Sequence, residues 1–213
     1  MVTSRTSTAS SSFVKTAGLW CLIGAVIGAL GGLVTGFIPP AVSFDLYSYP
    51  YTPSGFRVAQ IVFALNHVLL LVGLIGLARS GAVGSSLLGR IGLWVSGIGL
   101  VALTLCELGA MTLATSPYPG PGTDLMDTLY GVASILIGVG FLLTGIAVIT
   151  TRRWIGWQRY VTLICGVAVF VIVIPGVFGP FLAGRLALVV WMVLFMALGW
   201  ALFTLGSRAS SGK

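Results

Sequence analysis

Two ionisable side chains, His67 and Glu107, lie well inside the long apolar stretches of this sequence. An ionisable group at the centre of a bilayer costs at least about 2.5 to 3.5 kcal/mol on insertion scales, so each needs a partner or a water-filled cavity. The pair is therefore a candidate site for binding a proton or a small polar solute. Whether it acts in this way depends on the elements that place the two side chains.

The two residues belong to stretches joined by the short polar segment 80–86, which makes the stretches antiparallel neighbours. Counted at 1.5 Å per residue from the arginines that flank this segment, His67 lies roughly 18 Å deep and Glu107 roughly 25 Å deep. Gln60 is one heptad from His67 at roughly 28 Å, on the same face. We therefore expect His67 and Gln60 to bracket Glu107.

Two arginines, Arg57 and Arg185, lie near the outer ends of their stretches and could pair with Glu107. Three interpretations remain open at this point. Glu107 and a basic partner could form a buried pair that only fixes helix register. They could form a proton or solute site open to the outer side. Glu107 could also be a lone carboxyl that stays neutral.

The sequence offers little to support catalysis or metal binding. One histidine leaves a zinc site short of ligands and cannot supply both axial ligands of a membrane haem. The cysteines, Cys21, Cys106 and Cys165, all lie in apolar stretches without a CxxC pair. No metalloprotease, serine-hydrolase or phosphate-loop motif is present. We expect no enzymatic activity, no cofactor and no metal site.

The composition is that of a membrane protein. Of 213 residues, 57% are hydrophobic and 7% are charged, whereas an ordinary soluble domain has about 25% charged residues. The formal net charge of +7 could suggest nucleic acid as a partner, but the basic residues lie between apolar blocks and are typical of topology signals. A soluble enzyme, a disordered chain and a nucleic-acid-binding module all fit poorly.

Six apolar stretches are long enough to cross the bilayer, which takes about 20 helical residues. The sequence therefore predicts an all-α membrane protein, a six-transmembrane-helix bundle forming a single domain over residues 17–206. Residues 1–16 are expected to be a disordered cytoplasmic tail, and residues 207–213 a second cytoplasmic tail. The expected spans are 17–38, 58–78, 87–113, 128–151, 160–179 and 182–206.

Orientation follows from the basic residues, because cytoplasmic loops retain Lys and Arg. Arg57 and Arg185 fall on one side of the expected bundle, and the other nine basic residues fall on the opposite side. We therefore expect both termini to be cytoplasmic, in a multi-pass protein of the plasma membrane. The nine are Arg5, Lys15, Arg79, Arg90, Arg152, Arg153, Arg159, Arg208 and Lys213.

A stripe of glycines at every fourth position marks the first span. In lipid, small residues let helices approach closely, and this contact holds a bundle together. The stripe could pack against other helices of the same chain, or it could dock a partner subunit in the membrane. We call these residues the glycine stripe: Gly24, Gly28, Gly32 and Gly36.

The last span opens with Gly184-Arg185 and continues through Trp191. With the short basic inner turns and the six spans, this pattern resembles the small six-helix bacterial integral membrane proteins grouped as domains of unknown function. The resemblance is architectural and implies no activity.

From the residues alone we expect a non-catalytic membrane protein with an outward-facing site for a small solute or proton. The alternative is a structural or partner-binding subunit.

Overall fold

The computed structural model describes residues 3–211, with side chains for residues 11–207. All the long elements in this part are helices, and six helical segments are long and apolar enough to cross a membrane, as predicted. The elements are α1 (Thr3–Phe37), α2 (Pro53–Arg79), α3 (Leu87–Ala110), η1 (Met111–Leu113), α4 (Pro121–Thr151), α5 (Gln158–Ala168), η2 (Val169–Val173), α6 (Ile174–Val177) and α7 (Phe181–Ser211).

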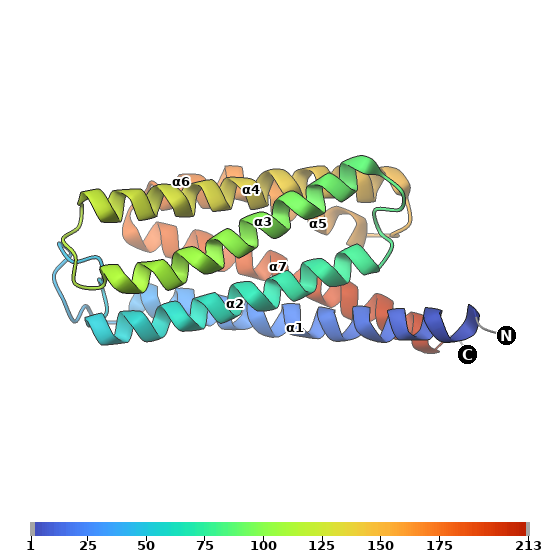
Figure 1. The fold of residues 1–213 in the computed structure, drawn as a ribbon, viewed down its shortest axis with the longest axis horizontal. Coiled ribbons are helices and arrows are strands. Elements are labelled where there is room, and N and C mark those ends of the chain that lie inside the picture. Colours follow the sequence, from blue (N-terminus) through green and yellow to red (C-terminus); the bar gives the residue numbers. More distant parts are fainter. Residues whose placement is uncertain (1–2, 212–213) are drawn as a thin grey trace.

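The helices form a closed ring, in which α1 packs between α2 and α7, α3 between α2 and α4, and α5 between α4 and α7. Figure 1 shows the two ends of the chain at the same end of the bundle. We call this the terminal end, which also holds segments 80–86 and 152–157. The opposite end, with loops 38–52 and 114–120, is the cap end.

Helices α2 and α4 begin earlier than predicted, at Pro53 and Pro121 in place of residues 58 and 128. Proline suits the first turn of a helix, because the missing N–H is not needed there and the fixed φ is already helical. At α2 the cap is completed by Thr52, whose side-chain oxygen accepts a hydrogen bond from the Gly55 amide at 3.2 Å. Polar residues at these two helix starts had been expected to belong to loops.

The expected disordered tail is helical in its described part, because α1 begins at Thr3 and runs unbroken to Phe37. Val14 is buried, and the guanidinium of Arg79 lies 4.3 Å from the ring centroid of Phe13. Lys15 similarly lies over the ring of Phe203. Contacts with α2 and α7 therefore order residues 11–16. At the other end α7 continues to Ser211, while positions 1, 2, 212 and 213 of the expected tails lie outside the described residues.

The fifth span is one continuous helical segment, Gln158–Val177, which contains a π-helical turn at Val169–Val173. Pro175 explains this turn, because proline has no N–H to donate and its ring would clash with the carbonyl four residues earlier. A π-turn widens the helix and absorbs the clash. The Ile174 amide accordingly donates to the Val169 carbonyl, five residues back.

The glycine stripe of α1 lies against α2 and α7 within the same chain. A Cβ atom added at Gly24 would come within 2.6 Å of Leu69 on α2, and one at Gly32 within 2.9 Å of Val189 on α7. Both distances are shorter than a carbon–carbon contact allows. A partner subunit that docked on the stripe would have to displace one of these helices.

Candidate functional site

Three helices bring four polar side chains together in the interior of the bundle. We call these side chains the polar cluster: Gln60, His67, Glu107 and Tyr130. The Tyr130 hydroxyl donates to Oε2 of Glu107 at 2.8 Å, and the Gln60 amide donates to the Tyr130 oxygen at 3.1 Å. His67 and Glu107 are each only 7% exposed. The cluster therefore joins α2, α3 and α4 through side-chain hydrogen bonds and the facing of His67 and Glu107.

His67 is the incomplete member of the polar cluster. Its Nδ1 atom faces Oε1 of Glu107 at 3.7 Å, which is within range of electrostatic attraction but too long for a hydrogen bond. This Nδ1 atom is buried and has no hydrogen-bond partner among the described residues. A buried polar atom without a partner costs about 1 to 3 kcal/mol. The gap between Nδ1 and Oε1 is therefore where a proton or a small polar group would be stabilised.

Gln60 and His67 both belong to the polar cluster, but His67 faces Glu107 directly, whereas Gln60 is joined to Glu107 only through Tyr130. Tyr130 was not among the residues that the sequence suggested for this site. A start of the fourth span at 128 leaves Tyr130 near the surface. The observed start at Pro121 carries Tyr130 more than two turns into the helix.

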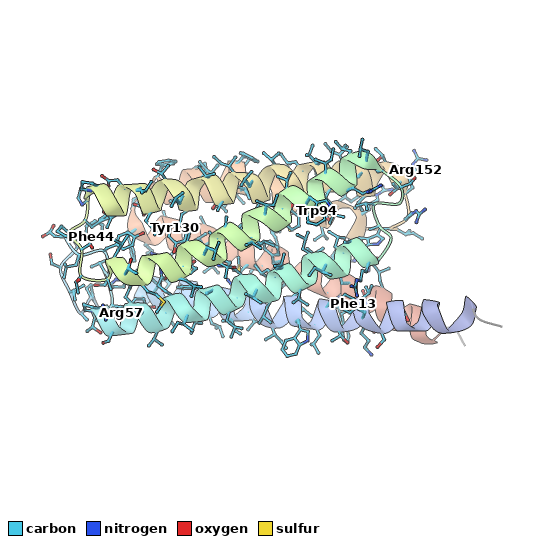
Figure 2. All side chains as sticks on the ribbon, viewed as in Figure 1. Phe13, Phe44, Arg57, Trp94, Tyr130 and Arg152 are labelled. Carbon is cyan, nitrogen blue, oxygen red and sulfur yellow. The ribbon has the colours of Figure 1, made fainter. Side chains whose placement is uncertain are left out.

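The two arginines expected near Glu107 have different roles. Arg185, on α7, interacts electrostatically with Glu107 but forms no ion pair with it, and its guanidinium lies 5.0 Å from the ring centroid of Phe181. Arg57 does not partner Glu107, because its Nε donates to the Met111 carbonyl at 3.3 Å. Figure 2 shows Arg57 at the cap end of α2. There it binds a carbonyl of the turn that ends the third span.

Two loops cover the polar cluster at the cap end. They are joined by backbone hydrogen bonds from Tyr47 to Ser116 at 3.1 Å and from Tyr118 to Asp45 at 2.7 Å. Both tyrosine hydroxyls also donate to Asp127 of α4, at 3.1 Å from Tyr47 and 3.0 Å from Tyr118. We call Tyr47, Tyr118 and Asp127 the tyrosine cap. It fastens both loops to the start of α4.

The electrostatics of Tyr47 connect the tyrosine cap to the polar cluster. Burial raises the pKa of Tyr47 above its usual value, and the negative charges of Asp127 and Glu107 raise this pKa further. Burial and then Asp127 raise the pKa of Tyr118 in the same direction. Tyr47 is thus close enough to interact with both Asp127 at the surface and Glu107 in the interior.

Three fully buried aromatic rings pack together in the middle of the bundle, and we call them the aromatic plug: Phe141, Trp191 and Phe195. The Phe195 ring packs edge-on against Trp191 at 5.2 Å and against Phe141 at 5.4 Å between centroids. The Trp191 indole N–H donates to the Cys165 carbonyl at 3.2 Å. These three rings therefore form a close-packed apolar group inside the bundle, separate from the hydrogen-bonded polar cluster.

Comparison of the chain with models of known protein families, with curated proteins and with solved structures finds no match. The class is therefore defined by the structure itself. The chain is an all-helical bundle with six helices that could span a membrane. Its half nearest the cap end holds a buried carboxyl and imidazole facing each other.

Proposed function

We propose that this chain is a non-catalytic, multi-pass protein of the plasma membrane that binds and releases a proton between Glu107 and His67. The observation that carries this proposal is the 3.7 Å approach of two buried groups, one of which has no hydrogen-bond partner in the described structure. A small polar solute that bridges the same two atoms would use the same chemistry. No cofactor or metal enters the proposal.

The cluster supplies what a proton site requires. Tyr130 donates to Oε2 of Glu107 and is itself held by a hydrogen bond from Gln60, which leaves Oε1 of Glu107 facing His67. A proton on either Oε1 or Nδ1 would turn two facing acceptors into a donor and an acceptor. The two atoms could then close to hydrogen-bond distance, which is about 2.7 to 3.2 Å.

The proton would enter and leave from the cap end. Tyr47 contacts Asp127 there and interacts electrostatically with Glu107, so small movements of the tyrosine cap would connect the cluster to water. The close-packed rings of the aromatic plug would obstruct a path through the bundle interior toward the terminal end. This arrangement favours a site that binds a proton over a conduit that passes protons across the membrane.

We further propose that the cap end faces the outside of the cell. Six of the nine basic residues expected on the inner side lie within the part whose side chains are described, all in segments near the terminal end. Arg57 and Arg185 lie near the cap end. Since cytoplasmic ends of membrane proteins are enriched in Lys and Arg, the polar cluster would sense the outer medium.

Infrared difference spectra recorded between two pH values test this proposal, because the carbonyl stretch of a protonated buried carboxyl is resolved in them. We expect the wild-type protein to show this band and Glu107→Gln to lack it. Asp124→Asn is the matched control, since Asp124 is an exposed carboxyl in the first turn of α4, and it should retain the band. Identical spectra for wild type and Glu107→Gln would refute proton binding at Glu107.

Proton flux into liposomes separates binding from transport. Because the aromatic plug would obstruct a path toward the terminal end, we expect wild-type protein and Glu107→Gln to give the same low flux with a pH-sensitive dye inside the vesicles. A wild-type flux that Glu107→Gln abolished would replace the binding site with a transport pathway. The infrared and flux measurements thus address different parts of the proposal.

A further inference from the structure

A second polar site lies at the terminal end, far along the bundle from the polar cluster. The end of α4 and the start of α5 surround a hollow of about 470 Å³, lined by Ile149, Thr150, Arg152, Arg159 and Tyr160. It therefore combines two cationic side chains with an aromatic ring and an aliphatic wall. We call it the arginine hollow.

Arg159 is held in place and still has an unused donor. Its guanidinium lies over the ring of Tyr160, 4.5 Å from the centroid, and its Nη2 donates to the Tyr160 hydroxyl. Its Nε is buried and has no hydrogen-bond partner among the described residues. A guanidinium fixed in this way is suited to the oxygens of a phosphate, which guanidinium groups bind through two parallel hydrogen bonds.

Arg152 occupies a backbone position at which glycine would be more favourable. It ends α4 with φ of 54°, in the left-handed region that helix ends usually give to glycine. Its side chain is exposed and makes no hydrogen bond or ion pair within the described part of the chain. By contrast, Nη1 of the adjacent Arg153 donates to the Gly81 carbonyl at 3.3 Å. Arg152 is thus the cation that remains available to the hollow.

We propose that the arginine hollow binds a phosphate group, and that this phosphate belongs to an anionic lipid headgroup. The neighbouring loop supports a lipid as the source, because Ile155 is 81% exposed and Trp157 is 51% exposed. Such side chains at a helix end are typical of the membrane interface, where tryptophan is enriched. Ile149 gives the hollow an apolar wall for the adjoining acyl chain, and basic residues near the membrane surface attract anionic lipids.

The Thr150 hydroxyl does not donate a hydrogen bond to a phosphate in this hollow. It already donates to the carbonyls of Ile146 at 2.9 Å and Ala147 at 3.1 Å. Recognition of phosphate would therefore depend on the two arginines and the tyrosine. The inference is independent of the proton site, since the two share no residue and lie at opposite ends of the bundle.

Lipid retention by the full-length protein tests this inference. The protein, in neutral detergent, is incubated with equal amounts of phosphatidylcholine and phosphatidylglycerol, and the bound lipid is counted by native mass spectrometry. We expect wild type to prefer phosphatidylglycerol and Arg152→Gln and Arg159→Gln each to bind it about fivefold more weakly. Arg90→Gln is the matched control, because Arg90 is an exposed arginine near the terminal end on α3, and it should behave as wild type.

Two further measurements keep the test decisive. Arg159→Lys keeps the positive charge but loses the planar guanidinium. We expect its affinity for phosphatidylglycerol to lie between those of wild type and Arg159→Gln. This variant also tests the site if Arg159→Gln proves unstable. Inorganic phosphate is added alone as a competitor, and displacement of the lipid at equal concentration would assign the site to free phosphate and overturn the lipid source. Equal phosphatidylglycerol retention by wild type, both hollow variants and Arg90→Gln would overturn the site itself.

Discussion

The hydroxyl of Tyr130 donates a hydrogen bond of 2.8 Å to Oε2 of Glu107, linking α4 to α3 inside the membrane. Tyr130→Phe should remove this bond and leave Oε2 without its donor. A hydrogen bond to a charged group contributes about 1.5 to 3 kcal/mol, and we expect a loss of stability of that order in thermal unfolding. Tyr49→Phe is the control, since the Tyr49 hydroxyl makes no hydrogen bond in the described structure. Equal melting temperatures for the two variants would contradict this role.

Two glycines of α4 should respond in opposite ways to the same substitution. At Gly140 an added Cβ would lie 2.4 Å from the Ser96 amide nitrogen and 2.7 Å from the Gly92 carbonyl oxygen, so α3 would have to move. At Gly131 nothing lies within 4 Å. We expect Gly140→Ala to destabilise the bundle by about 1 to 3 kcal/mol.

Gly131→Ala should be neutral or stabilising by up to about 1 kcal/mol, because alanine favours a helix interior. Thermal unfolding of both variants under the same conditions measures the difference. A Gly140→Ala protein as stable as Gly131→Ala would mean that α3 and α4 do not approach as closely as the structure shows.

The tyrosine cap should be sensitive to high pH. Burial and the charge of Asp127 raise the pKa values of Tyr47 and Tyr118 in the folded protein above the unfolded value of about 10. The folded state then binds more protons than the unfolded state above pH 10, so the stability from these groups is full below pH 10 and falls as pH rises further. Tyr47 contributes at most about 1.4 kcal/mol per pH unit, and the more exposed Tyr118 contributes less, because solvent screens its interactions.

Ultraviolet titration of tyrosinate measures this effect directly. Subtracting the titration of Tyr47→Phe from that of wild type should give one step, displaced above the ordinary pKa of tyrosine. Asp127→Asn should move this step toward lower pH, because it removes a negative charge that opposes ionisation of Tyr47. A difference curve centred on the ordinary tyrosine value would show that Tyr47 is not covered.

Removing one ring of the aromatic plug should open the interior of the bundle. Phe195→Ala deletes a fully buried ring that contacts Phe141 and Trp191, and such truncations cost about 3 to 5 kcal/mol in packed interiors. We expect a lower melting temperature and a raised proton leak in liposomes. Phe178→Ala, at a position that is 88% exposed, should change neither quantity.

Orientation can be read from introduced thiols, because Cys21, Cys106 and Cys165 are all buried. Ser43 is exposed in a cap-end loop, and Ser85 is exposed in the segment 80–86. A membrane-impermeant thiol reagent added to intact cells should label Ser43→Cys and should label Ser85→Cys only after lysis. The reverse pattern would place the polar cluster on the cytoplasmic side.

The six helices that could span a membrane follow from hydropathy and length alone, because an apolar stretch of sufficient length has few alternatives in lipid. That His67 and Glu107 lie on neighbouring antiparallel helices was also predictable from the short hairpin, but their 3.7 Å approach was not, since counting residues left them roughly 7 Å apart in depth. The hydrogen bond from Tyr130 to Glu107 was not predictable, because it depends on where α4 begins and on the rotation of α4 about its axis. Apolar residues surround these helices on all faces, so the sequence carries little rotational information.

The same limit explains the two arginines. Arg57 and Arg185 lie at comparable distances from the outer ends of their helices, and depth alone makes them equivalent partners for Glu107. The direction of each side chain separates them, since Arg57 binds the Met111 carbonyl while Arg185 lies within electrostatic range of Glu107. The helical residues 11–16 likewise depend on contacts with α2 and α7, which no local pattern encodes.

The position of α1 between α2 and α7 has a consequence for biosynthesis. Helix α1 is made immediately before α2, one of its two neighbours, but its other neighbour, α7, is made after all the other described helices. Until α7 is inserted, the nascent bundle is an open horseshoe in which part of the glycine stripe faces lipid. A chain that terminates before α7 therefore exposes a closely packing surface, which membrane quality control could recognise as unfinished.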